Sequence, residues 1–190
     1  MPASSIGWTK TLPGLLVVAK TETAQTDLVR QLQARSVRRE YLALASGDIA
    51  ISGTVDAPIG RHPVKRTSMA VVPAGKHAIT HYEVRERFGD STLIVCRLET
   101  GRTHQIRVHL ASIGHPLIGD RGYGRRAGVA ASRGGAAAGQ AGAPVFPRQA
   151  LHAWRLGLVH PVTRQAMTWE SPLPDDFSAL LDILRRRKRA

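Results

Sequence analysis

Short segments of alternating or β-branched residues, each ended by Gly, Pro or Asp, dominate the first half of the sequence. Such segments are typical of strands in a largely antiparallel sheet. Five of them follow one another: REYLALA, GTVDAPI, SMAVV, HAITHYEV and STLIVCRLE. Two more, LHAWRLGLV and QAMTWES, come late in the chain. The pattern predicts an α+β fold with a mixed, largely antiparallel sheet.

Three segments with apolar residues at helical spacing flank these strands. They lie at residues 21–37, at residues 103–114 and from Asp175 onward. Thr103 suits the N-cap of the second helix, and Gly114 suits its C-cap. The expected apolar faces consist of Leu28, Val29 and Leu32 in the first helix, Ile106, Leu110 and Ile113 in the second, and Phe177, Leu180, Leu181 and Leu184 in the third.

Three other stretches mark the organisation of the chain. LLVVAK at residues 15–20 has the continuous apolar run of a buried strand, whereas nothing before it has a structural pattern. Gly and Ala dominate residues 127–144, which predicts a flexible surface loop. We expect one domain at residues 15–184, an aberrant leader at 1–14, and a basic tail at 185–190 that contains RRRKR.

The balance of charge is strongly basic. Lys and Arg number 27 against 14 for Asp and Glu, so the formal net charge is +13. A chain this basic typically meets a polyanion, most often nucleic acid. The sequence has no long apolar run and no signal-peptide pattern, so we expect a cytoplasmic protein that does not enter a membrane. Cys96 lies in the apolar run LIVC and is expected to be a packed core thiol.

No metal or nucleotide-binding pattern is present in the sequence. Histidines 104, 109, 115, 152 and 160 lack the spacing of metal ligands. TGRTHQIR has a glycine beside basic residues, but it lacks the spaced glycines of a phosphate-binding loop. We therefore expect no metal and no nucleotide cofactor.

Arg107 stands out in the second predicted helix. It lies one turn from Leu110, at the edge of the apolar face, so its guanidinium should be half-buried. A half-buried Arg needs a carboxylate or phosphate partner, because an unpaired one costs about 3–5 kcal/mol. The spacing alone does not separate a structural ion pair from a functional one.

One long run gives the chain a family resemblance. LETGRTHQIRVHLASIGHPLIGDRGYG resembles the third motif of the RNA pseudouridine synthases that modify uridines in large-subunit ribosomal RNA and, in some members, transfer RNA. REYLALASG, LHAWRLGLVHP and WESPLPDDF match further motifs in the order of the family. The resemblance covers most of residues 15–178 and implies a pseudouridine synthase catalytic domain with no cofactor and no metal. It also implies 23S ribosomal RNA as the partner of a monomeric protein.

The resemblance also assigns site residues. Tyr41 would stack on the target base, and Arg107 would hold a catalytic aspartate ionised and oriented. Cleavage of the N1–C1′ bond and rejoining through C5 of uracil would depend on that aspartate. The resemblance further implies RNA contacts from four residues, which are Arg61, Arg102, His104 and Gln105.

The expected aspartate is absent. The family pattern resembles HRLDKDTSG, whereas the aligned residues here are IGWTKTLPG, with Thr9 at the aspartate and Gly7 at the arginine. The single codon of Trp8 ends in G and every threonine codon begins with AC, so a shift of one base yields GAC, an aspartate codon, at the catalytic position. We therefore expect residues 1–13 to be an out-of-frame reading of the motif in an N-terminally truncated, inactive synthase. The sequence leaves open whether the shift lies in the genome, the sequencing or the gene prediction.

Two alternatives to a synthase remain from the sequence. One is a non-catalytic, basic RNA-binding relative that keeps Tyr41, and the other is a basic structural protein without a uridine pocket. With Thr9 in place of the aspartate, we expect Arg107 to lack a carboxylate partner. On that expectation, Arg107→Met should be neutral or stabilising. The target uridine is not identified by the sequence.

Overall fold

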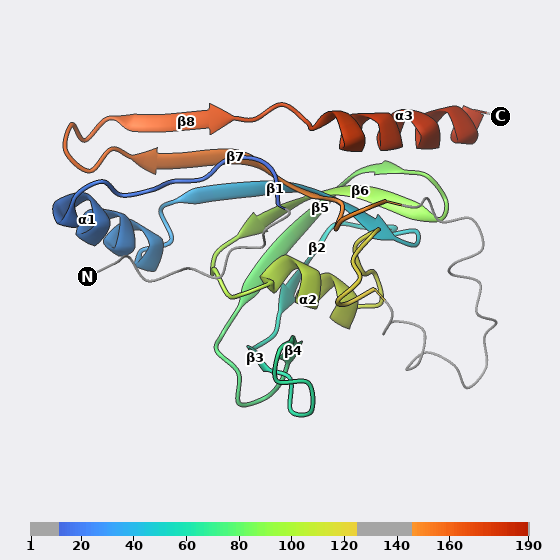
Figure 1. Ribbon diagram of the computed structural model, residues 1–190, viewed down its shortest axis with the longest axis horizontal. Coiled ribbons are helices and arrows are strands. Elements are labelled where there is room, and N and C mark those ends of the chain that lie inside the picture. The colour runs from blue at the N-terminus through green and yellow to red at the C-terminus, as the bar shows by residue number, and fades with distance from the viewer. Residues whose placement is uncertain (1–11, 125–145, 190) are drawn as a thin grey trace.

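The computed structural model describes residues 12–124 and 146–189, in which a main sheet has helices on both of its faces (Figure 1). The helices and strands in chain order are α1 Glu22–Gln33, β1 Arg38–Ser46, β2 Gly53–Asp56, β3 Ile59–Arg61, β4 Met69–Val71, β5 Ile79–Arg87, β6 Ser91–Leu98, α2 Gln105–Ser112, β7 Leu151–Val159, β8 Ala166–Glu170 and α3 Asp175–Arg189. Among the described residues, no helix is long and apolar enough to cross a membrane.

The main sheet has six strands in the order β2-β5-β6-β1-β7-β8, and β3 and β4 form a separate hairpin. Every strand pair is antiparallel. The α+β fold predicted from the sequence is confirmed, and the strands predicted from alternation are all present. A parallel contact occurs only as an isolated bridge between Gly14 and Ala153, among the described residues.

The two faces of the sheet bury different helices, because successive side chains of a strand point to opposite faces. On one face, Leu42 and Leu44 of β1 pack with α3. On the other, Ala43 and Ala45 pack with α2. Figure 1 shows α3 and α2 on opposite sides of the strands. The apolar face predicted for α3 is confirmed, since its members are all buried: Phe177, Leu180, Leu181 and Leu184.

The prediction of a buried strand at LLVVAK is wrong. Leu16 is 53% exposed and Val18 is 69% exposed, and no strand forms there. The physical reason is that β8 already pairs with β7 from Arg155 to Val159. The described chain before α1 pairs with β7 only at Ala153, which precedes the part of β7 that β8 takes. There the N–H of Leu15 donates a 2.9 Å hydrogen bond to the Ala153 carbonyl. The chain then leaves the sheet toward α1.

The predicted ends of α2 need correction. The N-cap is His104 and not Thr103, with a left-handed backbone at φ 58° and no side-chain cap. The C-cap is Ile113, and Gly114 follows it with φ +86°, the left-handed conformation that glycine adopts without strain. In α1, Thr21 caps the N-terminus as the sequence suggests, but Val29 is 44% exposed.

The predicted basic tail belongs in most part to α3, which continues to Arg189. Arg185 bonds Glu86 of β5 at 3.0 Å, and Arg187 bonds Asp90 in the turn before β6 at 2.5 Å. These ion pairs attach the end of the helix to the sheet. The predicted flexible loop at residues 127–144 and the first eleven residues of the leader lie outside the described residues.

Candidate functional site

Tyr41 lies on the α2 face of the sheet in a row that crosses four strands. Its neighbours across the ladder are Cys96 of β6 and Ala153 of β7, and Tyr82 of β5 pairs with Cys96. Burial raises the pKa of the Tyr41 hydroxyl, while the charge of nearby Arg39 lowers it. The hydroxyl is therefore neutral, and the partly buried Tyr41 side chain packs against the apolar cluster between the sheet and α2.

The start of the described chain reaches the same place. Leu12 packs into the cluster that contains Tyr41 and Tyr82, and Gly14 bridges to Ala153, the β7 neighbour of Tyr41. The described chain therefore begins on the Tyr41 side of the sheet. Gly7 and Thr9 themselves lie outside the described residues.

Arg107 of α2 has a carboxylate partner. Its Nε and Nη2 donate hydrogen bonds of 2.7 and 2.8 Å to the two carboxylate oxygens of Asp120, whose side chain is 0% exposed. The expectation of an unpaired Arg107 is therefore wrong. Asp120 lies thirteen residues further along the chain, in a turn after α2, and helical spacing predicts only contacts within a helix. The guanidinium also lies 4.8 Å from the ring centroid of Tyr123.

Asp120 is held by more than Arg107. The backbone N–H groups of Gly122 and Tyr123 also donate to its Oδ1, at 2.9 and 3.1 Å. Burial by itself raises the pKa of this carboxyl, but Arg107 and the two N–H groups together hold the pKa below its ordinary value. Asp120 is thus an ionised anchor for Arg107. In the sequence, Asp120 could be recognised by Gly122 two residues later, because this spacing is typical of an Asx turn.

Tyr123 connects this ion pair to the β3–β4 hairpin. Its hydroxyl accepts a 3.1 Å hydrogen bond from the N–H of Met69 in β4 and lies 2.9 Å from Nδ1 of His104. Burial and the charge of Arg107 lower the pKa of His104, so the imidazole is neutral and can accept from the Tyr123 hydroxyl. His104 therefore takes part in fixing the hairpin and is only partly available to RNA.

Gln105 is an internal residue of a buried polar network. Its side chain is hardly exposed, and its amide makes four hydrogen bonds within the protein, to Thr100, the Arg102 N–H, the Ile79 carbonyl and Thr80. Its position does not favour the predicted RNA contact, because no donor or acceptor of the amide is left over. We assign it instead a role in positioning the start of α2.

The network continues from Thr80 to His109. Nδ1 of His109 lies 2.9 Å from the Thr80 hydroxyl, and its Nε2 donates to the Ala57 carbonyl at 2.9 Å. Since a carbonyl only accepts, the proton sits on Nε2, and Nδ1 accepts from Thr80. Burial lowers the pKa of His109, which keeps this fully buried imidazole neutral.

Exposed cations gather on the hairpin and around the start of α2. Arg61 ends β3, and its Nη1 donates to the Arg66 carbonyl at 2.8 Å, while Nε of Arg102 donates to the His77 carbonyl at 3.0 Å. Both side chains are exposed. Lys65 and Arg66 between β3 and β4, Lys76 after β4 and Arg121 in the turn after α2 are exposed as well. This surface has the charge that an RNA backbone attracts.

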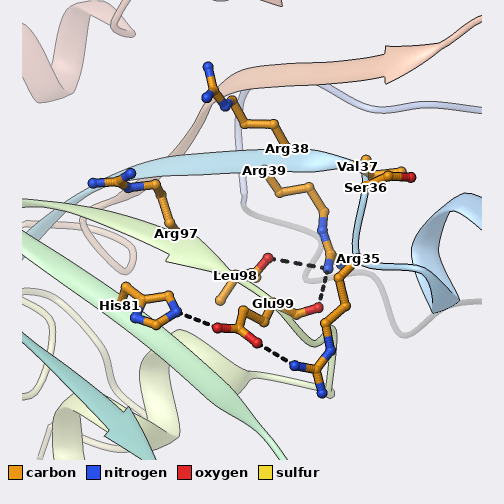
Figure 2. A pocket seen from close by; sticks show the side chains of 9 residues that line it. All are labelled: Arg35, Ser36, Val37, Arg38, Arg39, His81, Arg97, Leu98 and Glu99. Carbon is orange, nitrogen blue, oxygen red and sulfur yellow. Dashed lines mark hydrogen bonds and ion pairs between the residues drawn. The ribbon is translucent and has the colours of Figure 1, made fainter.

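Arg39 is a residue that the sequence does not single out. Its Nε is buried with no hydrogen-bond partner, and Nη2 reaches only the carbonyls of Leu98 and Glu99, at 3.5 and 3.3 Å (Figure 2). The strand pattern does not predict the unbonded Nε, because alternation indicates only that residue 39 and Tyr41 lie on the same face of the sheet.

Within residues 12–124 and 146–189, no three His, Cys, Asp or Glu side chains come together in a group that could hold a metal ion.

Comparison with known proteins gives consistent matches. A family model described as RNA pseudouridylate synthase matches residues 13–112. Ribosomal large subunit pseudouridine synthase D of Nitrosomonas europaea is 60% identical over 177 residues, which are 93% of this chain and 49% of that protein. The protein of the same name from Pseudomonas aeruginosa is 54% identical over 184 residues, covering 95% of this chain and 56% of that protein.

A solved structure shares the fold. The structure named Human RNA Pseudouridylate Synthase Domain Containing 1 is 28% identical with a TM-score of 0.64, and the match covers 91% of this chain and 74% of that one. The chain spans about half the length of the curated relatives it matches. The family match includes Tyr41 and Arg107 and leaves out Gly7 and Thr9.

Proposed function

Because the chain belongs to the RNA pseudouridylate synthase family, we propose that residues 15–184 are the catalytic domain of an enzyme that isomerises uridine to pseudouridine in large-subunit ribosomal RNA. The observation that carries this proposal is the family match across Tyr41 and Arg107. Tyr41 is partly buried in the sheet, Asp120 holds Arg107 through two hydrogen bonds, and exposed cations lie on the β3–β4 hairpin and at the start of α2.

In the proposed reaction, the target uridine leaves its stack and enters beside Tyr41, whose ring supports the base. An aspartate brought in on the segment before Leu12 would then act at the ribose. Asp120 binds Nε and Nη2 of Arg107, so Nη1 is the group that remains for this aspartate. Asp120 thereby positions Arg107, and Arg107 in turn would position the catalytic carboxylate.

The chain with Thr9 lacks that carboxylate, and we propose that it does not form pseudouridine. Asp120 does not replace it, because its side chain is fully buried and its oxygens already accept four hydrogen bonds. A protein that binds RNA without modifying it is therefore the second candidate function, favoured by Thr9 together with the net charge of +13.

A photocrosslink tests the base pocket without requiring catalysis. The chain is irradiated with a fragment of large-subunit ribosomal RNA that contains 4-thiouridine, and the crosslinked peptide is identified by mass spectrometry. We expect the crosslink on the β1 peptide that contains Tyr41, and its loss in Tyr41→Leu, which keeps an apolar side chain in the cluster. A crosslink confined to α3 would contradict the proposed pocket.

A further inference from the structure

A basic recess lies where the chain passes from α1 into β1, next to the end of β6. Its volume is about 290 Å³. The residues that line it are Arg35, Ser36, Val37, Arg38, Arg39, His81, Arg97, Leu98 and Glu99 (Figure 2). Four are arginines and one is acidic, so the recess is suited to an anion.

The acid in the recess is already neutralised. Nε2 of His81 lies 2.7 Å from Oε1 of Glu99, and Nη1 of Arg35 bonds Oε2. The bond from His81, with the charge and bond of Arg35, holds the pKa of Glu99 below its ordinary value, so the carboxylate stays ionised and keeps both partners. Glu99 therefore does not neutralise the other three arginines of the recess, which are Arg38, Arg39 and Arg97.

Two of those arginines have weak or exposed ion pairs. Arg38 lies 3.9 Å from Glu40, and Arg97 lies 3.2 Å from Glu83, with side chains that are 70% and 53% exposed. Figure 2 shows that both extend away from Glu99. Exposed pairs of this kind contribute little to stability, so their guanidinium groups can exchange these partners for a ligand at low cost.

Arg39 is the feature that most needs an explanation. Its guanidinium is largely buried, yet among the described residues no carboxylate forms an ion pair with it, and its buried Nε has no acceptor. Buried polar groups in native proteins are nearly always bonded, and a partly buried Arg without an anion is destabilising. An acceptor from outside the chain can reach the Arg39 guanidinium where it lines the recess, and would supply the anion that the described residues do not.

We propose that this recess binds a backbone phosphate of the RNA, adjacent to the nucleotide held at Tyr41. The proposal rests on the function proposed above. Where it lines the recess, the Arg39 guanidinium can donate to a phosphate oxygen, and Arg38 and Arg97, which also line the recess, add positive charge around it. Arg39 is two residues from Tyr41 in β1, and exposed Arg102 follows Glu99 by three residues. A phosphate in the recess would therefore continue a backbone path from the hairpin past Arg102 to Tyr41.

The first experiment measures RNA affinity by fluorescence anisotropy with a labelled hairpin from large-subunit ribosomal RNA. The recess variant is Arg38→Gln/Arg97→Gln, since both side chains are exposed and their loss should not disturb folding. The control is Arg30→Gln/Arg85→Gln, which removes two exposed charges outside the recess. We expect about tenfold weaker binding for the recess variant and a log–log salt slope smaller by about 0.7. The control should change affinity by less than about twofold. Equal losses in the two variants would overturn the site.

The second experiment identifies the ligand as a phosphate of the backbone. Single phosphates of the hairpin are replaced in turn by uncharged methylphosphonates, and each RNA is titrated with the parent chain, Arg39→Lys and the recess variant. One replacement near the bound uridine should weaken binding to the parent but have little further effect on either variant. Undiminished losses in both variants would overturn the proposal while leaving the RNA partner intact. If the parent binds no RNA, both this site and the proposed function fall.

Discussion

Arg107 and Asp120 form two parallel hydrogen bonds, of 2.7 and 2.8 Å, between the middle of α2 and the turn that follows it. The carboxylate is fully buried and the guanidinium side chain is 11% exposed. The pair therefore fixes the direction in which Arg107 points, whichever group occupies the position of Thr9.

Asp120→Asn should destabilise the chain by about 3 kcal/mol, because the change leaves the guanidinium of Arg107 in a buried site without its anion. Urea unfolding followed by circular dichroism measures this. Asp48→Asn is the matched control, since Asp48 also binds an arginine, Arg87, but both side chains are exposed. It should shift the midpoint only slightly. Similar midpoints for the two variants would show that the buried pair is not important for stability.

Arg107→Met should cost more than about 2 kcal/mol, because it leaves Asp120 buried without its cation. This reverses the expectation from the sequence, which has Arg107 unpaired and the substitution neutral or stabilising. A double-mutant cycle with Asp120→Asn should give a coupling free energy clearly above zero. Additive losses would show that the two side chains act independently.

Stability should fall as the pH drops from about 7 to about 5, partly through His109. The pKa of His109 is lowered in the folded chain, so on acidification the unfolded chain binds the proton first. The neutral imidazole therefore contributes its full stability above the pKa of the unfolded chain, which is about 6.5. That contribution is lost as the pH falls below this pKa. In His109→Gln, which is less stable at every pH, the slope of unfolding free energy against pH should be shallower in this window. An unchanged slope would assign the pH dependence to other groups.

Cys96 should resist alkylation in the folded chain. It is fully buried in the row beside Tyr41, and burial raises its pKa to about 12, so the thiolate is absent at neutral pH. Iodoacetamide at pH 8 followed by mass measurement should show no adduct until urea unfolds the chain. Rapid modification without denaturant would mean that the α2 face of the sheet opens readily.

Much of the fold could be predicted because its signals are local. Alternation in REYLALA and STLIVCRLE gives β1 and β6, and the spacing of Phe177, Leu180 and Leu184 gives the buried face of α3. LLVVAK could not be placed from its sequence, because whether an apolar run is buried depends on the free edge of β7, which β8 takes.

The site was less predictable because its contacts are distant in sequence. Tyr41 and Arg107 are identified by motif, but the partner of Arg107 is set by a turn, and the four amide bonds of Gln105 depend on how β5 meets α2. Arg39 has no pattern of its own, since an unsatisfied Nε is a property of its surroundings.

Formation of pseudouridine by a chimera tests the central claim most directly. The upstream half of the Nitrosomonas europaea relative, including its counterpart of HRLDKDTS, is joined at Gly14 to residues 14–190 of this chain. Large-subunit ribosomal RNA is incubated with the chimera, with the chimera bearing Tyr41→Leu, and with the chain itself, and nucleosides are quantified by mass spectrometry. We predict pseudouridine from the chimera that keeps Tyr41, and none from its Tyr41→Leu variant or from the chain itself. Product from the chain with Thr9, or none from a folded chimera that binds the RNA, would contradict the account.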